Sequence, residues 1–150
     1  MLKRTTEDTK WAMIRAKCGW MITGALMTLG PSVVRHFLPK MLGLWASAFP
    51  PTPDEAESEK SKGDPYTWQV TLECRSGALA ALSSFIKHCP ALLSDDIVRR
   101  VMIPLESCVA MTAHLPAIIR AHGNHLKVSA AMIRLRLYEA FKLLPPNSYE

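Results

Sequence analysis

Residues 66–89 read YTWQVTLECRSGALAALSSFIKHC, and their apolar spacing predicts one long helix. Pro65 suits its first turn, where the missing N–H has no partner in any case, and Pro90 follows its last turn. Arg75 is the one charged residue that interrupts the apolar stripe of this helix. That stripe consists of Trp68, Leu72, Leu79, Leu82, Phe85 and Ile86.

The opposite face of this helix carries small side chains rather than charged ones. They are Ser76, Gly77, Ala80, Ala81 and Ser84. The distance between two packed helices depends on the side chains at their contact, so small residues allow a second helix to approach closely. We therefore expect helices on more than one side of residues 66–89 and predict that this segment is the centre of the packing.

The composition indicates one helical domain. The chain has 150 residues, of which 49% are apolar, which is enough for a core of its own. No long stretch alternates apolar and polar residues with the period of two that is typical of a strand. We predict an all-α protein in which residues 1–150 form a single unit.

The residues before the central helix predict a first helical hairpin, 5–49. Gly30–Pro31 would form its tight connection, and Pro39 would cause either a kink or a helix break. The first helix would bury Trp11, Ile14, Cys18, Met21, Ile22, Ala25 and Leu29. The second would bury Val33, Val34, Phe37, Leu38, Met41, Leu42, Leu44, Trp45 and Phe49.

Residues 65–115 predict a second hairpin, and residues 116–150 a final helix and tail. In the second hairpin Ser94 would cap the returning helix, which Pro104 would interrupt. Its inner residues would be Ile97, Val101, Leu105, Cys108, Val109 and Thr112. The final helix would bury Leu126, Ala130, Ile133, Leu137, Phe141 and Leu144.

Residues 50–64 differ in composition from the rest of the chain. They contain three prolines, five acidic residues and two basic ones, with few apolar side chains. A segment of this kind has too little apolar surface to pack. We predict an exposed, mobile, acidic and proline-rich loop between the two hairpins.

A repeated pattern relates the two hairpins. Helices are expected to end at Gly30–Pro31 and at Cys89–Pro90, and each following helix contains a proline, Pro39 or Pro104. Paired helices with repeating inner stripes are typical of an α-solenoid of the HEAT type, with about two and a half antiparallel hairpins in this chain. Terminal repeats normally need a polar outer face, but the flank of the last helix carries apolar or small residues, so we expect these to be incompletely buried. The residues concerned are Ala131, Met132 and Leu135.

Several stretches resemble one known family. They are GALMTLGP (24–31), LPKML (38–42), WQVTLE (68–73), GAL (77–79), AHG (121–123), SAAMIRLRLYE (129–139) and LPP (144–146). Together they resemble the HEAT repeat-containing protein 5 family from about Gly19 onward. The resemblance implies a scaffold without a catalytic motif, packed against neighbouring HEAT repeats of a longer array. It also implies cytoplasmic vesicle traffic at the trans-Golgi network and endosomes, with the clathrin-adaptor accessory proteins aftiphilin and gamma-synergin as partners.

The four cysteines bear on the compartment of the protein. Cys18, Cys74, Cys89 and Cys108 lie far apart among apolar neighbours, and no secretory signal is expected. This usage predicts buried thiols in a reducing compartment. The uncharged run 18–34 contains three glycines and a proline and is shorter than the roughly 20 residues of a membrane span. We predict a cytoplasmic protein without a transmembrane segment.

Few residues suggest catalysis or metal binding. His122 and His125 lie three residues apart, but a zinc site needs further ligands at suitable spacing. His88 and Cys89 are adjacent in a helix and point in different directions, which argues against a nucleophile with its base. We predict no enzyme, no cofactor and no metal. The aromatic residues that could line a peptide groove continue inner stripes and are expected in the core: Trp45, Phe49 and Trp68.

Two hypotheses for the function follow. The first is a protein-interaction scaffold. The alternative is a basic helical module, with a net charge of +5, that binds nucleic acid or an anionic membrane surface through Arg99, Arg100, Lys127 and Arg136. The basic residues lie where solvated helix faces are expected and have no aromatic residues among them, so nucleic-acid binding is not expected. The candidate partner contacts are Arg99, Arg100, Lys127 and Arg136.

Overall fold

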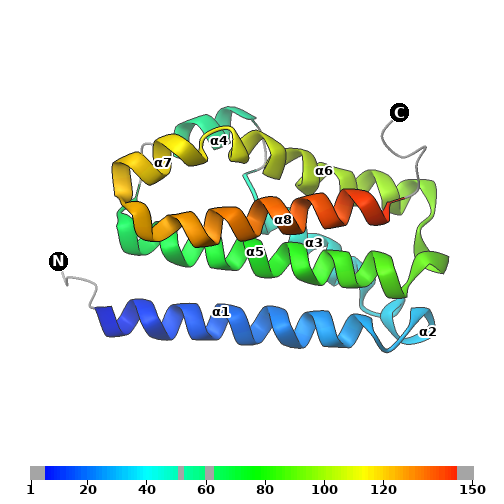
Figure 1. Cartoon of the computed structure of the whole chain (residues 1–150). Helices are drawn as coiled ribbons and strands as arrows, with labels where there is room; N and C mark the ends of the chain where they lie inside the picture. The colour runs from blue at the N-terminus through cyan, green and yellow to red at the C-terminus, as the bar shows by residue number, and fades with distance from the viewer. Residues whose placement is uncertain (1–5, 51–52, 60–62, 145–150) are drawn as a thin grey trace.

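The structure is a computed structural model that describes residues 6–50, 53–59 and 63–144, and the regular secondary structure in these ranges is helical (Figure 1). The all-α prediction is therefore confirmed. The first five residues and the predicted tail after Leu144 lie outside the described residues. The helices are α1 (Thr6–Met27), α2 (Pro31–Val34), α3 (Leu38–Ala48), α4 (Pro53–Glu59), α5 (Pro65–His88), α6 (Asp95–Thr112), α7 (Leu115–His122) and α8 (Lys127–Leu143).

Helix α5 is the centre of the molecule, and α1 and α8 lie along two of its sides (Figure 1). Going along α1, Trp20 packs on Gly77 of α5, and Met27 contacts Cys89 just after α5. Along α8, Ser129 contacts Glu73 of α5, and the later residue Arg136 contacts the later residue Ser76. The helices α1, α5 and α8 therefore run in parallel as one layer. Helix α6 runs in the opposite direction and packs on α3, α4 and α8.

Local chemistry explains where α5 begins. The Asp64 carboxylate accepts a hydrogen bond from the Thr67 N–H at 2.8 Å, which caps the helix, and Pro65 occupies its first turn. The apolar stripe predicted for this helix is buried in full, as is Arg75. The buried apolar residues are Trp68, Leu72, Leu79, Leu82, Phe85 and Ile86. The prediction of a central helix over residues 66–89 is confirmed.

The small face of α5 receives α1, as the sequence predicts. The Ser84 hydroxyl donates a hydrogen bond to the Gly24 carbonyl at 2.9 Å, so the two helices touch through side chain and backbone. A Cβ atom at Gly77 would lie only 2.7 Å from the Trp20 Cβ. Close approach of α1 therefore depends on the absence of a side chain at residue 77.

The face that α1 turns toward α5 differs from the predicted one. All seven residues of the predicted inner stripe are exposed: Trp11, Ile14, Cys18, Met21, Ile22, Ala25 and Leu29. Trp20, Gly24 and Met27 face α5 instead. Apolar residues lie on both faces of α1, and only the fit of Trp20 over Gly77 selects between the two. The prediction that Cys18 is a buried thiol is wrong for the same reason.

The remaining inner stripes are mostly confirmed. Val33, Leu44 and Val109 are exceptions, being 40%, 41% and 46% exposed. Each is the sequence neighbour of a buried residue and therefore lies about 100° around the helix from it. The buried members outside α5 are Val34, Leu38, Met41, Trp45, Phe49, Val101, Leu105, Cys108, Leu126, Ala130, Ile133, Leu137 and Leu144.

The two prolines within predicted helices behave differently. A break near Pro39 is present, because α2 and α3 are separate and Pro39 lies in the first turn of α3. Pro104 was predicted to interrupt a helix, but α6 continues through it. The Pro104 ring is buried, and its apolar contacts offset the lost backbone hydrogen bond. Ser94 caps α6 as predicted, accepting from the Ile97 N–H at 3.3 Å.

The predicted loop over residues 50–64 is corrected in part, because it contains α4. Pro53 begins this helix, and Asp54 and Glu55 lie in its first turn, where acidic side chains are favourable. A helix of seven residues is not stable in isolation, so contacts with the rest of the chain must hold it. Residues 51–52 and 60–62 of the predicted loop lie outside the described residues.

Candidate functional site

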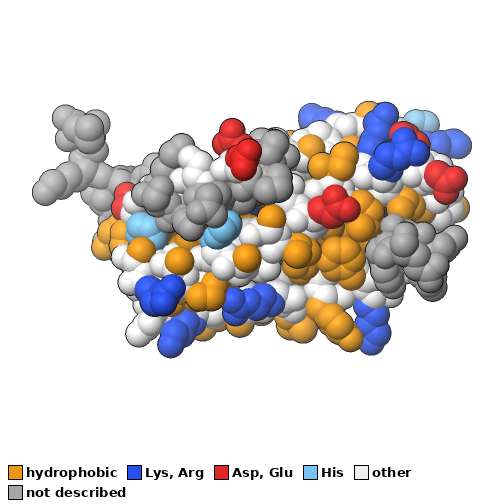
Figure 2. Space-filling model, turned by 90° about the horizontal axis from the view of Figure 1, so that it is seen from above, with side chains coloured by type: hydrophobic (Ala, Val, Ile, Leu, Met, Phe, Trp, Pro, Cys, Tyr) orange, Lys and Arg blue, Asp and Glu red, His pale blue; other side chains and the backbone are white. Residues whose placement is uncertain are grey.

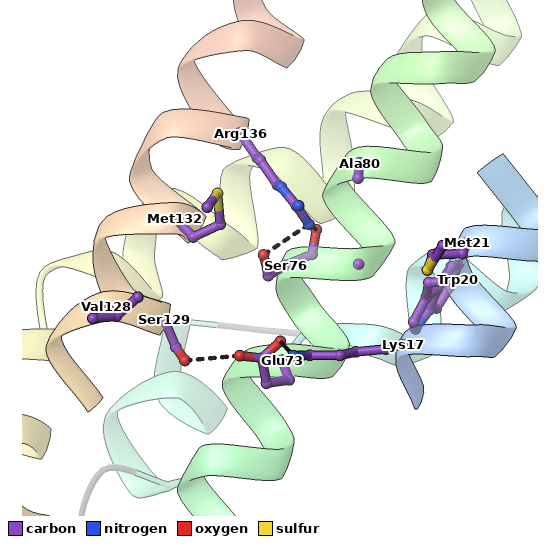
Figure 3. A pocket seen from close by; sticks show the side chains of 11 residues that line it. Lys17, Trp20, Met21, Glu73, Ser76, Ala80, Val128, Ser129, Met132 and Arg136 are labelled. Carbon is purple, nitrogen blue, oxygen red and sulfur yellow. Dashed lines mark hydrogen bonds and ion pairs between the residues drawn. The ribbon is translucent and has the colours of Figure 1, made fainter. Parts of the chain in front are cut away.

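A groove of about 430 Å³ runs along α5 between α1 and α8 (Figure 3). Its floor is the small face of α5, at Ser76, Gly77 and Ala80. Met21 of α1 and Val128 of α8 are 73% and 77% exposed, so both walls present apolar surface to solvent. The other lining residues are Lys17, Trp20, Glu73, Ser129, Met132 and Arg136.

Two polar clusters lie in the groove (Figure 3). The Ser129 hydroxyl donates to the Glu73 carboxylate at 3.1 Å, and the Lys17 ammonium lies 3.8 Å from the same carboxylate. One nitrogen of Arg136, Nη1, donates to both the carbonyl and the hydroxyl of Ser76, at 2.9 and 3.0 Å. Ser76 is neutral, and no carboxylate pairs with Arg136 among the residues that the structure describes.

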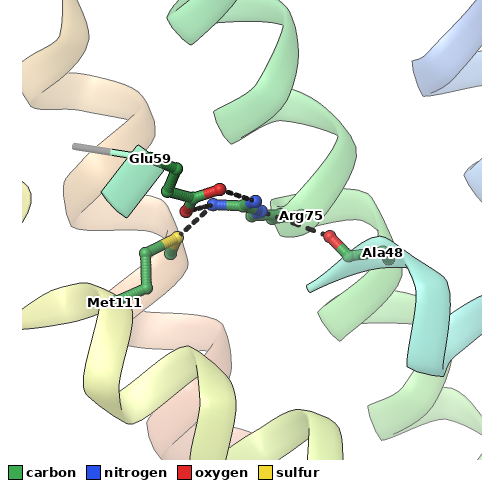
Figure 4. A network of polar contacts seen from close by, with 4 residues as sticks. All are labelled: Ala48, Glu59, Arg75 and Met111. Carbon is green, nitrogen blue, oxygen red and sulfur yellow. Dashed lines mark hydrogen bonds and ion pairs between the residues drawn. The ribbon is translucent and has the colours of Figure 1, made fainter. Parts of the chain in front are cut away.

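A second polar network lies inside the fold and joins four helices (Figure 4). Arg75 donates two hydrogen bonds to the Glu59 carboxylate, at 2.7 and 2.9 Å, in a bidentate ion pair. It also donates to the Ala48 carbonyl at 3.2 Å and to the Met111 sulfur at 2.7 Å. The Arg75 side chain is 8% exposed and that of Glu59 25%, so the arginine end of the pair is buried and the pair as a whole partly buried. The network attaches α4 to the core and serves the fold rather than a surface site.

The four predicted partner contacts do not gather at one place. Arg99 and Arg100 are exposed near the start of α6, where Arg100 pairs with Asp96 at 3.1 Å. Lys127 is exposed at the start of α8, at the opposite end of the molecule (Figure 1). Arg136 is half-buried and bonded to Ser76, which corrects the expectation that it is freely exposed.

On the face that carries α4, α6 and α7, lysine and arginine form several separate groups with apolar patches between them (Figure 2). A phosphate-binding surface would require basic residues clustered on one face or along one helix. The placement of basic residues on this face therefore gives no support to the alternative of a nucleic-acid or anionic-membrane module.

The histidines and aromatic residues have contacts within the fold. The rings of His122 and Trp68 lie 6.2 Å apart, and the His125 Nε2 is 3.4 Å from the Pro65 carbonyl oxygen. Within the described ranges no group of three or more histidine, cysteine or acidic side chains is placed to hold a metal ion. The core positions predicted for Trp45, Phe49 and Trp68 are confirmed, since each is less than 5% exposed.

The outer sides of α1 and α8, which face away from α5, expose apolar side chains. On α1 these are Trp11, Ile14, Ile22 and Leu26, with Leu29 in the turn that follows; on α8 they are Leu135 and Tyr138. We call these two surfaces the α1 flank and the α8 flank. The prediction that Ala131, Met132 and Leu135 are incompletely buried is confirmed, with Met132 38% and Leu135 51% exposed.

Across the described part of the chain, no helix taken alone has both the length and the apolar content to cross a membrane. The pair α6 and α7 meets this criterion only jointly, and the two helices meet at a bend of 54°.

Comparison with known proteins found no protein family whose model matches the chain and no solved structure that matches it.

Of the residues that line the groove, the sequence predicts only Arg136 as a contact residue. Lys17, Trp20 and Glu73 become neighbours only when α1 packs on α5. One signal was available on α8, where Val128, Met132 and Arg136 recur at every fourth residue and so share one side of the helix.

The four thiols are expected to differ sharply in reactivity. Cys18 is exposed, whereas Cys89 and Cys108 are fully buried. Burial raises the pKa of the Cys108 thiol to about 12, and burial also raises the pKa values of Cys89 and Cys74. Since the thiolate is the nucleophile, a maleimide or disulfide reagent should label Cys18 first.

The measurement is the mass of the native protein during labelling near neutral pH, with peptide mapping of the modified sites. We expect one fast site in the native state and four in denaturant. Labelling of Cys108 as fast as Cys18 in the native protein would contradict the packing of α6.

Proposed function

We propose that this chain is a segment of a HEAT-type α-solenoid that acts as a non-catalytic scaffold for protein–protein interaction. The arrangement of layers supports the proposal: α1, α5 and α8 run in parallel side by side, while α6 returns in the opposite direction and packs on α3. Successive antiparallel hairpins that stack on one another produce this order.

The observation that carries the proposal is the exposed apolar surface of the two flanks. In an array of stacked repeats each repeat buries its sides against its neighbours, and an end with no neighbour exposes apolar residues. The flank residues Trp11, Ile14, Ile22 and Leu26 of α1 follow helical spacing as a core stripe does, yet all four are exposed. Exposed apolar patches of this kind mark surfaces that bind other proteins.

The resemblance to the HEAT repeat-containing protein 5 family supports a more specific proposal. Two of the resembling stretches, 24–31 and 129–139, lie at the end of α1 and on α8, the two outer helices of the layer. We infer a role in clathrin-adaptor vesicle traffic at the cytoplasmic face of the trans-Golgi network and endosomes. The partners in this proposal are aftiphilin, gamma-synergin and adjacent repeats.

The flanks give the experiment that tests the scaffold proposal. Light scattering after size exclusion should show that the isolated chain associates with itself as its concentration rises, because the flanks have no other partner. The double variant Ile22→Glu with Leu135→Glu, which places a charge on each flank, should be a monomer with unchanged helical circular dichroism.

Ile103→Glu is the matched control, because Ile103 is 53% exposed on α6, away from both flanks, and its replacement should leave the association unchanged. A wild-type chain that stays monomeric at all concentrations and binds no apolar dye would overturn the scaffold proposal.

A further inference from the structure

We propose that the groove between α1 and α8 binds an amphipathic helix of another protein, which places an aspartate or glutamate against Arg136. The inference rests on the proposed scaffold function and deepens it by naming the chemistry of one partner. The groove is separate from the two flanks, which would hold adjacent repeats.

The course of the groove suits a helix. The groove lies along α5 between α1 and α8, so a helix laid along it would contact both of these helices. The floor carries only small side chains, at Ser76, Gly77 and Ala80, with Trp20 packed over Gly77 and Arg136 bonded to Ser76. A bound helix would therefore rest on the Trp20 and Arg136 side chains. Figure 3 shows this floor between the side chains of Met132 and Trp20.

The apolar walls select an amphipathic occupant. Val128 and Met132 line one wall, and Trp20 and Met21 line the other. Apolar residues at positions i, i+4 and i+7 of a partner helix would bury these walls. An added β-strand is a poor alternative, because the described part of the chain offers no sheet edge to pair with.

Charge determines what the polar edge of the partner carries. The negative charge of Glu73 is offset by Lys17 and by the hydrogen bond from Ser129. The positive charge of Arg136 has no such offset among the described residues, since its contacts are with the neutral Ser76. The Ser76 contacts use one guanidinium nitrogen and hold the side chain in place. A carboxylate is the group that pairs with the remaining N–H donors of the planar guanidinium.

The test is a selection from a displayed library of helical peptides, with leucine fixed at positions i, i+4 and i+7 and the remaining positions randomised. The full chain is the target. We expect the enriched peptides to carry aspartate or glutamate at one position beside the apolar stripe. Their dissociation constants should rise about tenfold or more with Arg136→Gln, because one charge-assisted contact is lost.

Met132→Glu should weaken binding of the same peptides, since it places a charge in the apolar wall. Arg134→Gln is the matched control: it removes the same charge from an exposed residue of α8 that does not line the groove, and binding should not change. Circular dichroism of each variant shows whether it folds.

Peptides that show no acidic preference, or whose binding is unaffected by Arg136→Gln and Met132→Glu, would overturn the groove proposal. If binding of such peptides is instead lost with Ile22→Glu, which lies on the α1 flank and does not line the groove, the scaffold proposal stands and only the groove proposal fails. A selection that enriches no binder at all would count against the groove, and the light-scattering test would then decide the scaffold proposal separately.

Discussion

Replacing Glu59 with glutamine is expected to lower the free energy of unfolding by about 3 kcal/mol, a large effect for a residue on a seven-residue helix. Glu59 supplies both carboxylate oxygens that bind Arg75. The Arg75 side chain is 8% exposed, so its charge would remain buried without compensation. Urea denaturation followed by circular dichroism gives the change in free energy.

The partner residue provides the critical comparison. Arg75→Met removes the buried charge and fills the space with an apolar side chain, while Glu59, whose side chain is 25% exposed, can still reach water. Arg75→Met should therefore cost less than Glu59→Gln, and Glu59→Gln should cost little in the Arg75→Met background. Glu106→Gln, on the exposed side of α6, is the control and should be close to neutral. Strictly additive effects of the two substitutions would show that the ion pair does not hold α4.

Gly77→Ala is expected to destabilise the fold by about 1–3 kcal/mol, although alanine is the better helix former. The added methyl group would lie 2.7 Å from the Trp20 Cβ and 2.8 Å from its Cγ. These atoms are close to the α1 backbone and cannot rotate away, so α1 must move off α5. Thermal and urea unfolding by circular dichroism measure the loss.

Two other helical glycines serve as controls, because replacing them with alanine is expected to change the stability in the opposite direction. Gly19 in α1 and Gly43 in α3 have no atom within 4 Å of an added Cβ. Their replacement by alanine should stabilise the protein by about 0.5–1 kcal/mol, the ordinary difference in helix propensity. If Gly77→Ala stabilised the protein as these two do, the close packing of α1 on α5 would be wrong.

Sequence patterns predicted α5 well because several local signals agree there. The apolar stripe has helical period, a proline stands at each end, and the opposite face is small enough to receive α1. Local signals also agree at the start of α6, where Ser94 is a good capping residue and Asp95 and Asp96 follow it in the first turn. Where local signals conflict with packing, as at Pro104, the buried environment decides and the helix continues.

The errors in the first half of the chain have a different cause. Helix α1 is apolar on two sides, so its periodicity does not show which side faces the core, and the longer of its two apolar stripes is the exposed one. Helix α4 lacks an apolar stripe, and its partner Arg75 lies 16 residues further along the chain. Such long-range polar contacts leave no periodic signal in the sequence.

The groove could be predicted only in part. Arg136 was identified as a contact residue, but its bond to Ser76 spans 60 residues of sequence. The lining residues come from three helices, and their proximity depends on the parallel order of α1, α5 and α8. Without the position of α1, no local pattern places Lys17 beside Glu73.

Amide hydrogen exchange of the isolated chain, followed by mass spectrometry, tests directly whether α5 is the centre of a stack with open sides. We predict the slowest exchange in α5, over the residues from Leu72 to Ile86, because α5 is covered by α1 and α8 and its apolar stripe is buried. The first half of α1, where Trp11 and Ile14 are exposed, should exchange much faster. Equal protection of α1 and α5, or faster exchange in α5 than in α1, would contradict this arrangement.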